Sequence, residues 1–173
     1  MNRPRISVYI AHSLDGYIAD ADGSLDWLFA RAGDGDHGYA GFMAGIDGLA
    51  MGRRTWDFIA DEPDIPFEGR PVYVFTGRPA APRDGVTFWS RTPQQAVAEW
   101  RAAGLRHVYV DGGRLISDFL AAGLVDDFTL TVVPVLLGSG ARLFHEIAVQ
   151  TSLRLDSATP YPNGLVQLRY ERT

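Results

Sequence analysis

Short apolar runs alternate with segments of helical pattern along most of the chain. The runs are rich in β-branched and aromatic residues and predict buried strands at 6–11, 48–52, 71–75, 86–89 and 108–111. Amphipathic or capped segments between them predict helices at 53–59, 93–103 and 113–122, with a weaker one at 39–44. Strands and helices in this alternation are typical of an α/β protein with a mostly parallel sheet.

The last part of the chain has a different pattern. A long strand rich in threonine and valine is predicted at 127–135. It is followed by apolar alternation at 153–155 and 165–170 on either side of a Pro162-Asn163-Gly164 turn, which predicts an antiparallel hairpin. With no internal repeat or linker, residues 1–173 are expected to form one domain. Its expected architecture is a mixed, mostly parallel sheet flanked by helices, with a C-terminal antiparallel hairpin.

Two polar stretches carry no clear periodicity. Residues 17–27 are predicted to form a long loop, and long loops in compact domains often cover ligands. Residues 31–38 are rich in glycine and aspartate, and no element is predicted there.

Composition and charge exclude several classes of function. A net charge of −5 argues against general binding of nucleic acid or anionic membranes. The absence of cysteine excludes disulfides, thiolate nucleophiles and cysteine-based zinc sites, and the four histidines lack metal-ligand spacing, so no metal is expected. The first apolar run is too short for a signal peptide and no run is long enough to span a bilayer, so a cytoplasmic location is expected.

Three predicted strands end on glycine beside hydroxyl or cationic side chains. The motifs are Gly52-Arg53-Arg54-Thr55, Thr76-Gly77-Arg78 and Asp111-Gly112-Gly113-Arg114. Arginine in the first turn of a helix opposes the helix dipole and favours a bound anion. Since the carboxyl ends of parallel strands meet at one edge, the three motifs could line one extended polyanion, such as a dinucleotide phosphate. Ordinary tight turns and a solvated basic turn are the alternatives.

The order of five motifs is similar to that of a known group of enzymes. These motifs are Ser13–Ala19, Met51–Thr55, Thr76–Pro79, Asp111–Arg114 and Val133–Gly140. Together they resemble the dihydrofolate reductase superfamily. The resemblance is strongest to its branch that includes the reductase domain of the riboflavin-biosynthesis deaminase-reductase, and it covers nearly the whole chain.

This resemblance implies NADPH as the cofactor and assigns residues to its parts. Gly52, Arg53, Arg54 and Thr55 would bind the adenosine end and the pyrophosphate, with Thr76, Gly77 and Arg78 near the 2′-phosphate. Asp111, Gly112, Gly113, Arg114 and Leu115 would form the wall under the pyrophosphate, with the glycine pair joined by a cis peptide. Ala11 and Ile18 would flank the nicotinamide, and Tyr17, Trp27 and Thr131 would line the substrate pocket.

Hydride transfer also needs a proton source, for which Asp15, Asp26 and a bound water are the candidates. Asp15 could equally be a turn residue before Gly16. Counting onward from Trp27 leads to Arg31 and Ala32, where folate reductases carry a carboxylate, and Tyr17 stands where riboflavin reductases tend to carry lysine. A homodimer is expected from the resemblance.

The expected function is therefore an NADPH-dependent reductase of a small heterocycle. The first substrate candidate is 5-amino-6-(5-phosphoribosylamino)uracil of riboflavin synthesis. Dihydrofolate reduction, a nucleotide-binding module without catalysis, and a generic α/β domain without cofactor are the alternatives.

Overall fold

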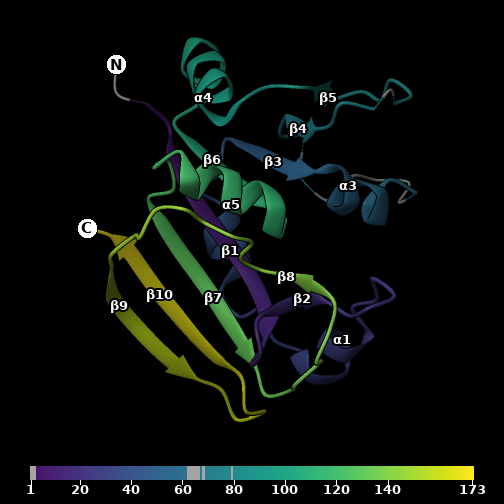
Figure 1. Ribbon diagram of the computed structural model, residues 1–173, viewed down its shortest axis with the longest axis vertical. Coiled ribbons are helices and arrows are strands. Elements are labelled where there is room, and N and C mark those ends of the chain that lie inside the picture. Colours follow the sequence, from purple (N-terminus) through teal and green to yellow (C-terminus); the bar gives the residue numbers. More distant parts are fainter. Residues whose placement is uncertain (1–2, 62–66, 68, 79) are drawn as a thin grey trace.

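The computed structural model describes residues 3–61, 67, 69–78 and 80–173 (Figure 1). An eight-stranded sheet has the order β5-β4-β3-β6-β1-β7-β10-β9. Its strands are β1 (Arg5–Ser13), β3 (Gly48–Gly52), β4 (Val72–Phe75), β5 (Val86–Trp89), β6 (His107–Asp111), β7 (Asp127–Val133), β9 (Leu153–Pro160) and β10 (Val166–Arg172).

All neighbouring strands from β5 to β7 are parallel, whereas β10 is antiparallel to both β7 and β9. The predicted fold class is therefore confirmed, including the C-terminal antiparallel hairpin. The hairpin is longer than its alternation predicted, because β9 extends to Pro160.

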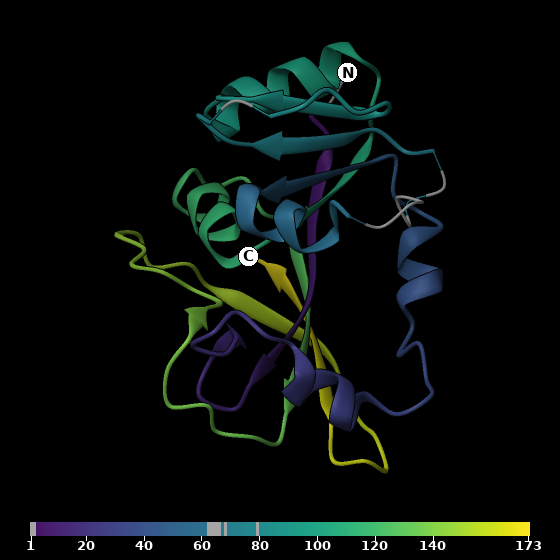
Figure 2. The same ribbon diagram turned by 90° about the vertical axis from the view of Figure 1, so that its right-hand side faces the viewer.

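Five helices occur within the described ranges, and they cover both faces of the sheet. They are α1 (Asp26–Ala32), α2 (Tyr39–Met43), α3 (Arg53–Ile59), α4 (Pro93–Ala102) and α5 (Gly113–Ala121). Figure 2 shows α5 on one face and α2 on the other. Thr92 and Gln95 form the predicted capping box at the start of α4, with Pro93 in its first turn.

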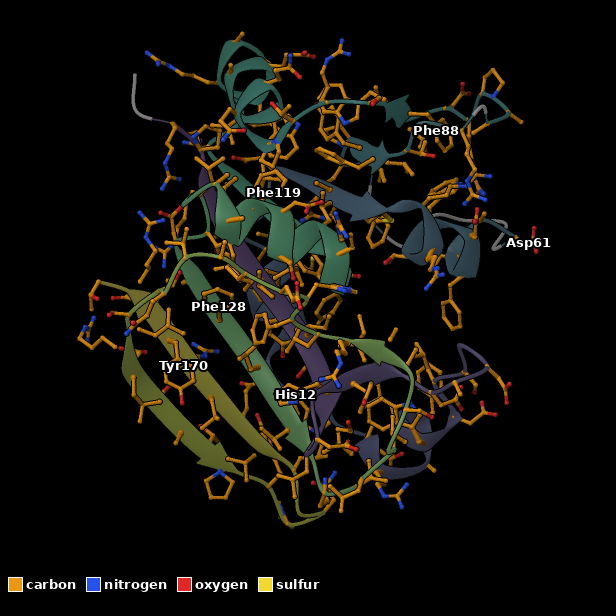
Figure 3. All side chains as sticks on the ribbon, in the orientation of Figure 1. His12, Asp61, Phe88, Phe119, Phe128 and Tyr170 are labelled. Carbon is orange, nitrogen blue, oxygen red and sulfur yellow. The ribbon has the colours of Figure 1, made fainter. Side chains whose placement is uncertain are left out.

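The larger apolar cluster lies between α4, α5 and one face of the sheet. Trp100 of α4 and Phe119 of α5 stack with ring centroids 5.8 Å apart, and both side chains are fully buried. Phe128 of β7 belongs to the same cluster (Figure 3). A second cluster on the opposite face contains Met43 of α2 and Trp56 of α3. Burying side chains of this size supplies roughly 2–3 kcal/mol each, which fixes both layers against the sheet.

The prediction of a long loop at 17–27 was correct for residues 20–25 and wrong at both ends. Tyr17–Ala19 forms strand β2, which pairs with β8 (Ala141–Arg142), and α1 begins at Asp26. Strand β2 is short and depends on a partner far along the chain, so its local sequence carries little signal. Helix α1 has no side-chain cap and buries only Trp27, so neither a cap nor a periodic stripe marks it.

Candidate functional site

The glycine-ended strands converge at the carboxyl edge of the sheet. In the parallel register Met51 is paired with Asp111, and Gly52 with Phe75. A Cβ built on Gly112 would lie 2.7 Å from Oγ1 of Thr55 and 3.7 Å from the backbone nitrogen of Gly52. The motifs predicted from β3 and β6 are thus in direct contact.

Two of the predicted cationic residues meet at one carboxylate. Nε of Arg53 lies 2.6 Å from Oδ1 of Asp57, and Nη2 of Arg78 lies 3.9 Å from Oδ2 of the same side chain. Sequence reasoning missed Asp57, although its i,i+4 spacing from Arg53 was a usable signal. The two arginines, from α3 and from the loop after β4, therefore share one anion.

The remaining members of these two motifs surround the arginines. Oγ1 of Thr76 accepts a hydrogen bond from the backbone N–H of Arg78 at 3.0 Å, which shapes the turn after β4. Arg54 is exposed. Pro79, the last residue of the predicted motif, lies outside the described residues.

Gly52 and Gly77 are open to an approaching group. A Cβ built on either residue would meet no atom of the described residues within 4 Å. Gly52 has φ −74°, which any residue can adopt, so neither backbone conformation nor internal packing requires glycine there. An open glycine followed by an arginine suits close approach of a phosphate to the backbone, so these residues fit the dinucleotide phosphate of NADPH.

Backbone conformation and close packing explain why both residues after β6 are glycine. Gly112 has φ +92°, a conformation that favours glycine, and a Cβ on Gly113 would collide with the carbonyl oxygen of Arg142. No cis peptide occurs among the described residues, so the expected cis bond between the two glycines was wrong.

The other predicted residues of this wall point elsewhere. Leu115 is buried in the larger apolar cluster. Arg114 is exposed and lies 3.2 Å from Asp118, one turn further along α5. Neither side chain joins the arginines at Asp57.

The predicted substrate side of the site has a polar floor. Ala11 of β1 is directly paired with Thr131 of β7, which is paired with Gln167 of β10. Nε2 of Gln167 donates to Oγ1 of Thr131 at 3.3 Å and to the hydroxyl of Tyr9 at 3.1 Å. Gln167 was missed because β10 reads only as an alternating strand, and nothing local marks a buried amide.

A loop carbonyl lies over this floor. The carbonyl oxygen of His37 accepts hydrogen bonds from the Tyr9 hydroxyl at 2.7 Å and from Gln167 at 3.0 Å. Tyr9 and Gln167 therefore present donors to a carbonyl group at this position.

Asp111 is a carboxyl group with a raised pKa at the carboxyl end of β6. It ends β6, and its Oδ1 accepts a hydrogen bond from the N–H of Gly112 at 2.8 Å. Burial raises the pKa of Asp111 to about 6, and hydrogen bonds to Gly112 and Tyr109 only partly oppose that rise. A carboxyl group with this pKa exchanges protons near neutral pH, which suits an acid catalyst.

Asp15 has the opposite character. It accepts hydrogen bonds from the Ser13 hydroxyl at 2.6 Å and from the N–H groups of Leu137 and Gly138 at 3.1 and 2.7 Å. These bonds, that of Ser13 foremost, lower the pKa of Asp15 to about 2. The geometry thus favours the turn-residue interpretation, because Asp15 carries no proton to donate at neutral pH.

Four of the predicted residues lie on β2 and α1. Strand β2 contains Tyr17 and Ile18, and α1 contains Asp26 and Trp27. Asp26 is exposed in the first turn of α1. The Tyr17 ring lies under the guanidinium of Arg142 at 5.2 Å. Ile18 packs on the larger cluster, whereas Trp27 is buried against Val133 and Leu165. The indole N–H of Trp27 has no hydrogen-bond partner among the described residues, but the same holds for Trp89 and Trp100, so it does not by itself mark a ligand site.

Two further polar features lie at opposite ends of β1. An open depression of about 360 Å³ lies between Arg3, Arg5, Asp126 and Glu171, at the amino end of β1, where these charges pair with one another. His12, near the carboxyl end of β1 (Figure 3), has Nδ1 2.7 Å from the carbonyl oxygen of Ser13.

Within the described ranges no histidine, aspartate or glutamate side chains cluster as metal ligands. None of the described helices combines the length and apolarity needed to cross a membrane.

Comparison with known proteins identifies relatives along nearly the whole chain. The family model of the RibD C-terminal domain matches residues 4–167. The uncharacterised protein YwjB of Bacillus subtilis is 39% identical over 168 residues, which are 95% of this chain and 96% of YwjB. The riboflavin biosynthesis protein RibD of Corynebacterium ammoniagenes is 31% identical over 158 residues, which are 81% of this chain and 46% of RibD.

Solved structures agree with this relationship. A Shewanella sp. PV-4 protein, provisionally assigned to riboflavin biosynthesis by its name, has a TM-score of 0.90 and 34% identity, covering 98% of this chain and 99% of that one. Dihydrofolate reductase from Enterococcus faecalis, complexed with NADP(H) and RAB-propyl, has a TM-score of 0.70 at 18% identity, with 99% of each chain covered. At that identity the likeness concerns the fold alone. The chain belongs to the RibD C-terminal domain family and has the dihydrofolate-reductase-like fold.

Proposed function

We propose that this chain is an NADPH-dependent reductase that transfers hydride to a small heterocyclic substrate. The observation that carries the proposal is the convergence of Arg53 and Arg78 on one carboxylate, beside the open backbone of Gly52 and Gly77. Two guanidinium groups next to accessible glycine backbone form an anion site at the carboxyl edge of a parallel sheet. Membership of the RibD C-terminal domain family and the likeness to an NADP(H)-bound reductase support the same cofactor.

Each part of the site has a task in this proposal. NADPH, when bound, supplies the hydride, so the chain contributes positioning, water exclusion and a proton. Arg53, Arg78, Gly52 and Gly77 would hold the phosphates. Thr131 would contact a polar edge of the heterocycle, and Gln167 and Tyr9, whose donors are bonded to the His37 carbonyl, would hold the side chain of Thr131 and this part of the sheet in place.

Asp111 is the proposed proton source. Its carboxyl group is partly buried, and its raised pKa keeps a useful protonated fraction near neutral pH. Asp15 is ionised by its three hydrogen bonds, and Asp26 is exposed on α1. The pyrimidine intermediate 5-amino-6-(5-phosphoribosylamino)uracil is the first substrate to test, since the family is that of RibD.

The cofactor assignment is tested by thermal shift with NADPH and NADH on the parent and on Arg53→Ala and Arg78→Ala. NADPH should raise the melting temperature more than NADH, and each variant should lose most of that difference. Arg101→Ala, an exposed arginine on α4, is the matched control and should behave like the parent. Equal NADPH stabilisation in the parent and both variants would overturn the assignment.

The reaction is tested by following NADPH oxidation with the pyrimidine and with dihydrofolate. Turnover of the pyrimidine alone supports a reductase of the riboflavin type, and turnover of dihydrofolate alone favours the folate alternative. NADPH binding without turnover of either substrate would favour a binding module.

A further inference from the structure

Asp57 occupies the position between the two arginines that are proposed to hold the cofactor phosphate. It lies on α3, one turn after Arg53. Its Oδ1 is 2.6 Å from Nε of Arg53, and its Oδ2 is 3.9 Å from Nη2 of Arg78. One carboxylate oxygen thus faces each guanidinium, as two oxygens of a phosphate would.

The three side chains differ in exposure. That of Arg53 is 26% exposed, whereas those of Asp57 and Arg78 are 48% and 71% exposed. Because Asp57 and Arg78 are well solvated, their pairing contributes little to stability and does not hold Arg78 rigidly. A dianionic phosphate at the same position would compete with Asp57 for both arginines and would be repelled by its charge.

We infer that Asp57 competes with the 2′-phosphate of the cofactor for Arg53 and Arg78, and so limits the preference for NADPH over NADH. The inference rests on the proposed function and extends it to cofactor selectivity. A carboxylate beside the site penalises the phosphorylated dinucleotide, whereas NADH carries no charge at that position. Loss of the carboxylate charge therefore acts mainly on NADPH.

The test is Asp57→Asn, which removes the charge and keeps the side-chain shape. Dissociation constants for NADPH and NADH are measured by titration calorimetry on the full chain at low ionic strength. The NADPH dissociation constant should fall about fivefold, while that for NADH changes by less than about twofold. Raising the salt concentration should shrink the gain, because screening weakens the repulsion between exposed charges.

A matched control removes an equivalent charge elsewhere. Oε1 of Glu99 lies 2.7 Å from Nε of Arg91, and both side chains are exposed, as in the pair of Asp57 and Arg78. Glu99→Gln should leave both dissociation constants at the parent values. Adenosine 2′,5′-bisphosphate and 5′-AMP, titrated in the same way, separate the effect of the 2′-phosphate from that of the rest of the cofactor.

The possible results have distinct meanings. If the parent prefers NADPH and Asp57→Asn leaves that preference unchanged or lowers it, the inference is overturned while the proposed function stands. If the parent binds neither dinucleotide, both are overturned. Asp57→Ala provides a second variant with the same expected direction, so a poorly folded amide variant does not decide the question.

Discussion

The Cα of Gly113 lies against the carbonyl oxygen of Arg142, so closely that no Cβ can be accommodated between them. The carbonyl oxygen of Leu143 would be 2.9 Å from the same Cβ. Both neighbours are backbone, which cannot rotate away as a flexible side chain could. Gly113 therefore lets the first turn of α5 pack directly on β8 and the residue that follows it.

We predict that Gly113→Ala lowers the free energy of unfolding by about 3 kcal/mol or more, because backbone must shift to admit the methyl group. Urea titration followed by circular dichroism provides the measurement. Gly41→Ala, in helix α2, is the control. A Cβ at this position would meet no neighbouring atom of the described residues within 4 Å, so the substitution should stabilise the protein by about 0.5–1 kcal/mol. Equal unfolding midpoints for the two variants would contradict this account of the packing.

Asp111 should make stability fall as the pH rises from about 4 to about 6. Its folded pKa of about 6 exceeds its ordinary value of 3.8, so the native state binds more protons than the unfolded state in that interval. Asp111→Asn has no buried carboxyl group to ionise, so its free energy of unfolding at pH 7 should exceed that of the parent by about 1–3 kcal/mol. The two proteins should converge below pH 4, and urea titration at both pH values measures the difference. If Asp111→Asn raised the free energy of unfolding equally at pH 4 and pH 7, titration of Asp111 would be excluded as the cause.

The same substitution should act on turnover. If Asp111 donates the proton, Asp111→Asn should lower kcat by about 10²–10⁴-fold with little change in NADPH affinity, and parent kcat should decline above about pH 6. Asp26→Asn should match the parent in kcat and pH profile. The idea fails if Asp26→Asn, rather than Asp111→Asn, abolishes turnover.

Asp15→Asn should reduce stability at neutral pH without shifting the pH profile of kcat. The lowered pKa of Asp15 means that its stabilisation is present above about pH 4 and is lost as the pH falls toward 2. Thermal melts at neutral pH and near pH 2 should therefore show a difference from the parent only at the higher pH. A difference that persists near pH 2 would point to altered packing.

His107 should reduce stability on acidification. Its Nε2 lies 2.7 Å from Oγ of Ser7, and burial lowers its pKa below the ordinary value of 6.5. Since the folded state disfavours the charged ring, stability is complete above pH 6.5 and declines as the pH falls below it. His107→Gln should flatten that decline, measured as the difference from the parent at pH 7.5 and 5.5. Parallel curves for parent and variant would refute a role for this ring.

Regular elements with local signals could be predicted from the sequence. Helix α4 carries its capping box and β3 its continuous apolar run, so both were placed nearly to the residue. The strand-end glycines could be grouped at one edge because parallel strands present their carboxyl ends together.

The features that were missed depend on contacts distant in sequence. Strand β2 forms by pairing with β8, and residue 113 is glycine because a Cβ there would collide with the carbonyl oxygen of Arg142. Similarly, Gln167 matters because β10 places it beside Thr131. No local pattern marks such positions, whereas Asp57 could have been found from its spacing to Arg53.

The two ends of the proposed cofactor site differ in how the chain assembles them. Strands β3 and β4, with Arg53 and Arg78, lie within one stretch of the sequence and pair with each other. The opposite end depends on β1 pairing with β7 and on Asp15 bonding to Gly138 across 123 positions. Loop closure over such separations slows folding. During refolding, the part that contains Arg53 and Arg78 should therefore form early, whereas the part that contains Asp15 should form only when β1 has paired with β7.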